Sequence, residues 1–153
     1  MKHSKAAFAA IFISLIVCCT YAQQKRVGTF NRRAVALAYY RSPQWAQVLS
    51  QKRAELKAAQ QADDPKKVDE LNKWFGESQE LAHQQVFGSE PVDNILFAMK
   101  PAIQEICKAQ NLAGVVPSPA PGSTQSVDVT EALLGWLQAD EKTRDLIRQM
   151  PQK

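Results

Sequence analysis

Apolar residues recur at steps of three and four across residues 91–117, and this spacing predicts an amphipathic helix followed by a strand. The apolar stripe comprises Val92, Ile95, Leu96, Met99, Ile103, Ile106 and Ala109. We expect Ser89 to be the N-cap of this helix and the helix to end near Asn111. Pro101 lies inside the pattern and is expected to kink the helix, because proline lacks a backbone N–H. The segment 113–116 then predicts a short buried strand.

Two further amphipathic stretches precede this region. Ser42-Pro43 is a helix start, with a capping side chain followed by proline at the first position. The apolar positions of the first helix are Trp45, Val48, Leu49, Leu56, Ala59 and Ala62. Asp63-Asp64-Pro65 ends that helix and caps the next one, whose apolar positions are Val68, Leu71, Trp74, Phe75, Leu81, Ala82 and Val86. The short turn between them predicts an antiparallel helical hairpin.

The hairpin is expected to leave apolar surface uncovered. Ser50 and Lys52 interrupt the first stripe, and Ser78 interrupts the second, so the two helices cannot complete a dry seam. Gly76 and the segment 88–91 are expected to bend the returning helix or to divide it. Because two helices alone bury little surface, the outer part of the hairpin is where we look for function.

The remaining elements predict a small body at the two ends of the exported chain. Residues 25–31 and 127–129 are predicted strands, the second followed by a helix capped by Asp128 or Thr130. A last short helix begins at Asp140. The predicted fold is mostly α with a small β body, in which residues 23–41 and 108–153 form the body and residues 42–107 a long helical hairpin arm.

Residues 1–22 predict an export signal. A basic start is followed by an apolar run at 6–17 and by small residues ending at Ala22, so cleavage is expected before Gln23 and the protein is expected in the periplasm. The apolar run is shorter than the roughly 20 residues that a membrane span needs. An uncleaved anchor and a lipoprotein modified at Cys18 or Cys19 are the alternatives.

Charge is distributed unevenly along the chain. Residues 23–57 carry eight basic residues and Glu55 as their one acidic residue, whereas the rest of the chain after them is net acidic. This asymmetry indicates either pairing between subunits or weak contact with an anionic membrane surface. Solvated charge without a partner is the other interpretation. No basic motif interleaved with aromatic residues is present, so nucleic acid is not an expected partner.

The sequence contains no recognisable catalytic constellation. His83 is the one histidine after the export signal, and it lies among polar residues, which predicts a solvated side chain rather than a metal ligand. Cys107 follows Ile106 in the apolar stripe, which predicts a buried structural thiol. A nucleophile pair of Cys107 and His83 has no motif around it. With no phosphate loop or nucleophile elbow, we expect no enzyme activity, no cofactor and no metal.

The order of these features resembles the Skp/OmpH family of periplasmic chaperones. An export signal is followed by the strand Val-Gly-Thr-Phe-Asn at 27–31 and a helical hairpin. The helix Ala-Ile-Gln-Glu-Ile-Cys-Lys-Ala-Gln-Asn-Leu at 102–112 then leads into Val115-Val116. The segment Val-Asp-Val-Thr-Glu-Ala-Leu-Leu at 127–134 resembles the closing part of the family. These segments span most of residues 25–137, and none is a catalytic signature.

The resemblance implies a homotrimer whose strands form a shared trimerisation body and whose helical arms enclose unfolded outer-membrane proteins. The subunit interface implied in the body comprises Val27, Phe30, Val115 and Val116. The implied client-binding residues of the arm are Trp45, Leu49, Leu56, Leu71, Trp74 and Phe75. The arm is short for the family, because residues 45–62 extend over about 27 Å at 1.5 Å per residue.

Two non-enzymatic hypotheses follow. The first is an ATP-independent holdase chaperone that binds unfolded outer-membrane or other envelope proteins. The alternative is a structural or adaptor protein of the cell envelope that docks the hairpin on one fixed folded partner. The first predicts many unfolded clients, and the second predicts one folded partner in fixed ratio.

Overall fold

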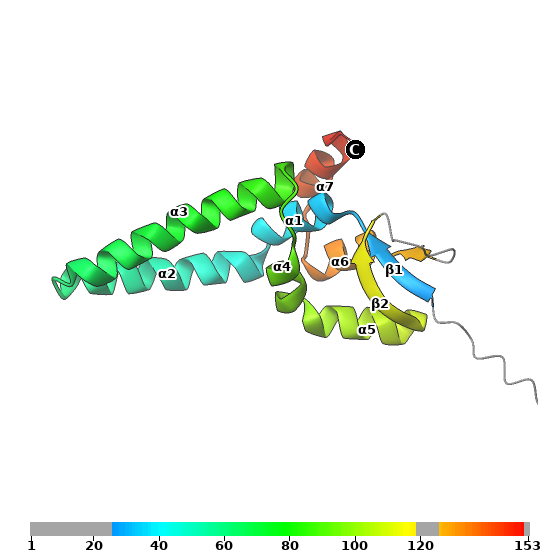
Figure 1. Ribbon diagram of the computed structural model, residues 1–153, viewed down its shortest axis with the longest axis horizontal. Helices are drawn as coiled ribbons and strands as arrows, with labels where there is room; N and C mark the ends of the chain where they lie inside the picture. The colour runs from blue at the N-terminus through cyan, green and yellow to red at the C-terminus, as the bar shows by residue number, and fades with distance from the viewer. Residues whose placement is uncertain (1–25, 119–125, 152–153) are drawn as a thin grey trace, which may run out of the picture.

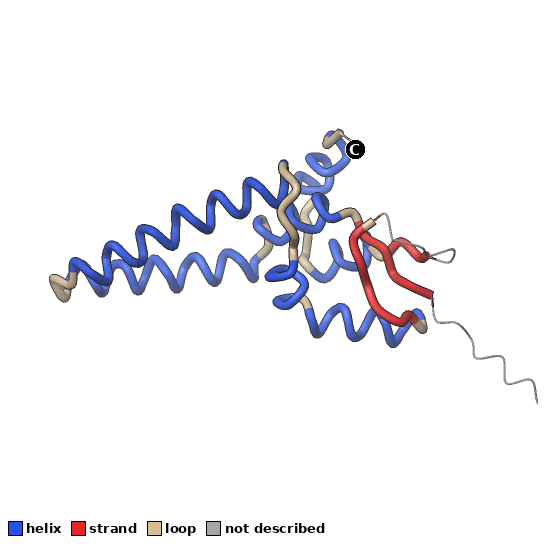
Figure 2. Tube along the Cα trace, in the orientation of Figure 1, coloured by secondary structure: helices blue, strands red, loops and turns tan. Residues whose placement is uncertain are grey.

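The computed structural model describes residues 26–118 and 126–151, and the expected export signal lies outside the described residues. The described chain is mostly helical and contains a small parallel sheet, which confirms the predicted class of a mostly α protein with a small β body. Figure 2 shows the strands gathered at one end of the molecule and helices making up the rest. No helix in 26–118 or 126–151 is long and apolar enough to cross a membrane.

The sheet places β1 (Arg26–Phe30) between β2 (Leu112–Pro117) and β3 (Ser126–Asp128), and both pairings are parallel. The predicted strands are therefore present, within one or two residues of their expected ends. Gly28 pairs with Val115 on one side and with Val127 on the other. A Cβ atom at Gly28 would lie 3.0 Å from Leu112 Cδ1 and 3.1 Å from Val115 Cγ2, so any larger residue there would have to displace these β2 side chains by a few tenths of an ångström.

Three helices of the body complete the core beside the sheet. They are α1 (Arg32–Tyr40), α6 (Thr130–Trp136) and α7 (Glu141–Gln149). Asn31 and Asp140 cap α1 and α7, each accepting a backbone N–H three residues on. The largest fully buried side chains of the whole core are those of Phe30, Ile95, Met99, Leu133, Leu134, Leu137, Gln85, Val35 and Val129.

Two long helices, α2 (Pro43–Gln61) and α3 (Pro65–Phe87), pack against each other and extend away from the sheet (Figure 1). Their N-caps are those predicted: Ser42 Oγ accepts from the N–H of Trp45, and Asp64 Oδ1 accepts from the N–H of Lys67. Gly76 lies inside α3, so of the two predicted alternatives a division of the helix at Gly76 is wrong. Helix α3 ends before Gly88, so the segment 88–91 divides the returning helix, which is one of the two predicted alternatives.

The predicted single helix after residue 91 is wrong, because two short helices take its place. They are α4 (Asp93–Ala98) and α5 (Lys100–Gln110), separated at Met99. Pro101 falls in the first turn of α5, where a missing backbone N–H costs no hydrogen bond. Ser89 is not the N-cap, since α4 begins after Val92 without a side-chain cap. Asn111 does end α5, in the left-handed conformation at φ 52°.

The helices α4 and α5 pack with the body, which differs from the predicted arm at 42–107. Ile95 of α4 and the C-cap residue Met99 lie in the buried core. Helix α5 packs along β2. Other residues of the predicted apolar stripe are partly buried against the same core, namely Leu96, Ile103 and Ile106. The extended helix pair is therefore formed by α2 and α3 alone.

Candidate functional site

A continuous cluster of five aromatic rings lies where the α2/α3 pair meets the body. The rings belong to Tyr39 and Tyr40 of α1, Trp45 of α2, and Trp74 and Phe75 of α3. Trp45 contacts both tyrosines, with ring centroids 5.7 Å from Tyr39 and 5.1 Å from Tyr40. Trp45 also stacks on Trp74 across the helix pair, at 6.1 Å between centroids. Such ring contacts add to area burial and give the pair a defined geometry at its base.

A groove of about 300 Å³ opens beside this cluster. It is lined from α1 and α2 by Tyr40, Trp45, Leu49 and Arg53, and from α3 by Phe75, Ser78, Gln79 and Ala82. The residues on α2 are spaced by four, and those on α3 by three and four, so each helix contributes one face. The groove is therefore formed by two facing helix stripes and closed at the body end by Tyr40.

The structure brings three of the predicted arm residues into this groove. Trp45, Leu49 and Phe75 line it and are half-buried. Trp74 is half-buried beside them, and the ammonium of Lys52 lies 5.7 Å from its ring centroid. Leu56 and Leu71 do not line the groove.

Leu71 is only 3% exposed in the single chain, so its predicted role as a client-contacting residue is wrong for this conformation. Its side chain is buried in the contact between the two helices. Ala59 of α2 is also buried, and α2 and α3 pack against each other.

Five lining residues were not among the predicted site residues: Tyr40, Arg53, Ser78, Gln79 and Ala82. Arg53 follows Leu49 by one helical turn, so the i, i+4 rule applied to Trp45 and Leu49 would have indicated it. Tyr40 carries no such signal, because only the packing of α1 against α3 brings it to the groove.

A buried amide fixes the position of Tyr40. Gln85 of α3 is 1% exposed, and its Oε1 accepts a hydrogen bond from Tyr40 Oη at 2.6 Å. Gln85 Nε2 donates to Asn94 Oδ1 at 2.7 Å and to the carbonyl of Pro91. Burial raises the pKa of Tyr40 above its ordinary value. The network joins α1, α3 and the start of α4, and so holds the body end of the groove.

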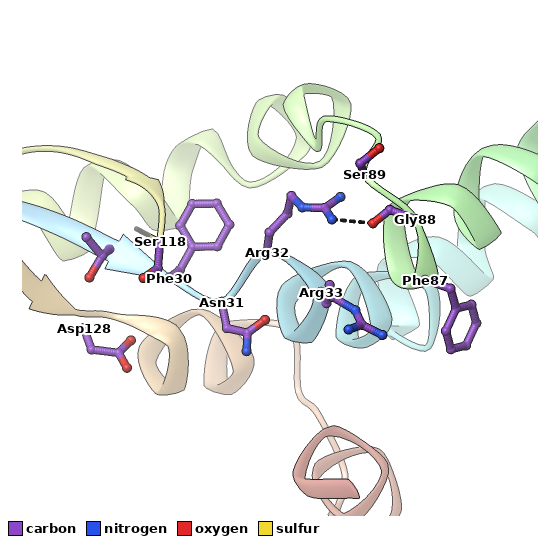
Figure 3. Close-up of a pocket in the computed structure, with 10 residues that line it drawn as sticks. Phe30, Asn31, Arg32, Arg33, Phe87, Gly88, Ser89, Ser118 and Asp128 are labelled. Atoms are coloured by element: carbon purple, nitrogen blue, oxygen red, sulfur yellow. Dashed lines mark hydrogen bonds between the residues drawn. The ribbon is translucent and has the colours of Figure 1, made fainter. Parts of the chain in front are cut away.

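A second cavity, of about 690 Å³, lies at the carboxyl ends of the three strands (Figure 3). Its arginines are already bound to the end of α3. Arg32 Nη2 donates to the carbonyl of Gly88 at 2.6 Å, and Arg33 Nε donates to that of Val86 at 2.8 Å. These guanidiniums satisfy carbonyls that the helix leaves unpaired and place positive charge at its negative end. Their role is to fasten α3 to α1.

The predicted interface residues of the body do not share one environment. Phe30 is fully buried in the core of its own chain, so its side chain cannot contact another subunit, and that prediction is wrong. It is the last residue of β1 and points among the helices that cover the sheet. Val27, Val115 and Val116 are half-buried.

The two residues considered for chemistry lie apart from the groove. His83 is exposed on α3, with its ring centroid 5.1 Å from that of Phe87. Cys107 of α5 is half-buried against the core. Within 26–118 and 126–151, no three or more His, Cys, Asp or Glu residues form a group that could hold a metal ion.

Comparison of this chain with protein-family models, curated proteins and solved structures found no match.

Proposed function

We propose that the protein is an ATP-independent holdase of the periplasm that binds unfolded outer-membrane or other envelope proteins. The observation that carries the proposal is the groove on the extended α2/α3 pair, which leaves apolar and aromatic side chains partly exposed. A pair of helices reaching away from the body can approach a large flexible chain from its side. Apolar contacts of this kind need no nucleotide, because burial of apolar area is itself favourable.

The α2/α3 pair acts in this proposal as the arm of a homotrimer. In the described sheet, β2 and β3 are the edge strands, and each has one side without a strand partner. Val115 and Val116 of β2 are half-buried and become covered when subunits join. Three arms around one body then present three grooves to the same client, which raises the effective affinity of each weak contact.

The test is suppression of aggregation of an unfolded outer-membrane barrel diluted from denaturant, followed by light scattering. Ala82→Leu fills the groove from α3 with a good helix former, and Ala58→Leu adds the same side chain at an exposed position of α2 outside it. The proposal predicts protection by the wild type and by Ala58→Leu, and reduced protection by Ala82→Leu. No protection by the wild type at stoichiometric excess contradicts it.

A fixed folded partner is the second candidate, and two exposed aromatic residues favour it. Phe87 at the end of α3 is 61% exposed, and Phe97 of α4 is 80% exposed. Exposed aromatic side chains of this size are common anchors of protein interfaces. A pull-down that returns one folded protein in fixed ratio, lost on Phe97→Ala and kept on Ala82→Leu, supports this candidate over the holdase.

A further inference from the structure

The groove combines an apolar floor with a single cation. Of its eight lining residues, Arg53 is the one that carries charge, and Trp45, Leu49 and Phe75 are large apolar side chains. Ser78 and Gln79 add polar side chains along the α3 rim. A volume of about 300 Å³ lies at the lower end of the range for ligand pockets, so it suits one large side chain rather than a folded surface.

Among the described residues, Arg53 is one of several charged residues on the helix pair without an intramolecular partner, and it is the one that lines the groove. Lys52 pairs with Glu55 at 2.8 Å, and Lys73 pairs with Glu77 at 3.7 Å. Within the part of the chain that the structure describes, Arg53 forms neither a salt bridge nor a side-chain hydrogen bond. A guanidinium binds a carboxylate through two parallel hydrogen bonds, which makes an acidic group its complementary ligand.

We propose that the groove binds an extended segment of unfolded chain in which an aromatic residue and an aspartate or glutamate occupy positions i and i+2, in either order. This inference rests on the proposed function, in which the helix pair holds unfolded chains. The aromatic ring lies on the floor beside Trp45 and Phe75, and the carboxylate pairs with Arg53. The edges and faces of the existing rings favour an aromatic guest over an aliphatic one of similar area.

The spacing follows from the geometry of the two chains. Leu49 and Arg53 are one helical turn apart, a rise of about 6 Å along α2. In an extended chain, residues i and i+2 point to the same side and lie about 6.6 Å apart. A ring level with Leu49 therefore places a carboxylate two residues away at the level of Arg53. An acidic residue adjacent to the aromatic one points to the opposite side and cannot reach it.

The first experiment compares four labelled ten-residue peptides by fluorescence anisotropy with the purified protein at low salt. The reference peptide carries Phe and Asp at positions i and i+2, with one residue between them, in a Gly-Ser background. The others replace Asp with Lys, place Asp directly beside Phe, or replace Phe with Ala. We expect the reference peptide to bind at least about fivefold more tightly than each of the others. Equal affinity for all four peptides overturns the inference.

Variants of the protein test the role of Arg53. Arg53→Glu should reverse the preference, so that the peptide with Lys binds more tightly than the peptide with Asp. Lys66→Glu changes the net charge equally, at an exposed cation of α3 outside the groove. It should retain the preference of the wild type. A preference that survives Arg53→Glu, or that both variants lose alike, overturns the inference, with circular dichroism confirming that each variant is folded.

The peptide assay and the aggregation assay test the two proposals separately, so that either proposal can be rejected without the other. Protection of the unfolded barrel without peptide preference leaves the holdase proposal standing and rejects the recognition of paired aromatic and acidic residues. Selective peptide binding without protection of the barrel supports the groove chemistry and rejects the holdase.

Discussion

The indole rings of Trp45 and Trp74 stack across the helix pair, with 6.1 Å between their centroids and 30° between their planes. Trp45 is in the first turn of α2, and Trp74 is near the middle of α3, so this contact sets how the two helices meet near the body. The same two rings continue the aromatic cluster from the tyrosines of α1 to Phe75. The same aromatic cluster therefore lines part of the groove and joins α2 and α3 to α1.

Trp74→Ala should destabilise the protein by about 2 kcal/mol, below the 3–5 kcal/mol typical of fully buried tryptophan, because Trp74 is half-buried. It removes the contacts to Trp45 and Phe75 and the approach of the Lys52 ammonium. Urea denaturation followed by circular dichroism measures the change. Phe97→Ala, at a ring that is 80% exposed, is the control and should stay within about 0.5 kcal/mol of wild type.

Gln85→Ala should cost about 1–3 kcal/mol, since it leaves the partly buried Tyr40 hydroxyl and the Pro91 carbonyl without their partner. Thermal unfolding measures the loss. A double-mutant cycle with Tyr40→Phe tests the mechanism, because the two substitutions remove the same hydrogen bond and their effects should not add. Fully additive effects would show that Gln85 acts through packing alone.

Ser42→Ala should destabilise the protein by about 1 kcal/mol. Ser42 Oγ accepts from the N–H of Trp45 at 3.2 Å and donates to the carbonyl of Tyr39 at 2.7 Å, so one hydroxyl joins the end of α1 to the start of α2. Ser50→Ala is the matched control, at an exposed interior position of the same helix where alanine is a better helix former. Equal stability of the two variants, measured by urea denaturation, would contradict the assigned cap.

Stability should fall at alkaline pH. Burial raises the pKa of Tyr39 and of Tyr40 above the ordinary value of 10.0. Below pH 10 both residues are protonated in the folded and the unfolded chain, so their contribution is constant. Above that pH the unfolded chain loses these protons first, which favours unfolding until the folded pKa values are passed.

Denaturation midpoints from pH 8 to pH 11.5 measure the effect, and replacing both tyrosines with phenylalanine should flatten the profile relative to wild type. A double variant whose stability falls as steeply as that of the wild type would assign the alkaline loss to other groups, such as the lysines.

Local signals predicted the elements whose ends depend on nearby residues. The caps at Ser42, Asp64 and Asp140 and the end at Asn111 are found where the side-chain chemistry indicates. Pro101 was predicted to kink one helix, whereas it lies in the first turn of α5. Proline is compatible with both positions, and the local sequence does not show where the preceding helix ends.

Contacts between residues far apart in the sequence could not be predicted from the pattern of apolar and polar side chains. Arg32 and Arg33 bind backbone carbonyls at the end of α3, more than fifty residues away, and carbonyls leave no trace in a pattern of side chains. The burial of Phe30 also depends on residues that are distant in the sequence. The family resemblance implied a subunit interface at Phe30, but the core of its own chain buries it completely.

Site-specific photo-crosslinking shows directly whether the groove between α2 and α3 holds unfolded chains. A photoreactive amino acid is introduced at Gln79 in the groove, or at Gln104, an exposed residue of α5 outside it. An unfolded outer-membrane barrel should crosslink at position 79 and not at position 104, and the folded barrel should crosslink at neither. Equal crosslinking at both positions, or none at position 79, would contradict this role of the groove.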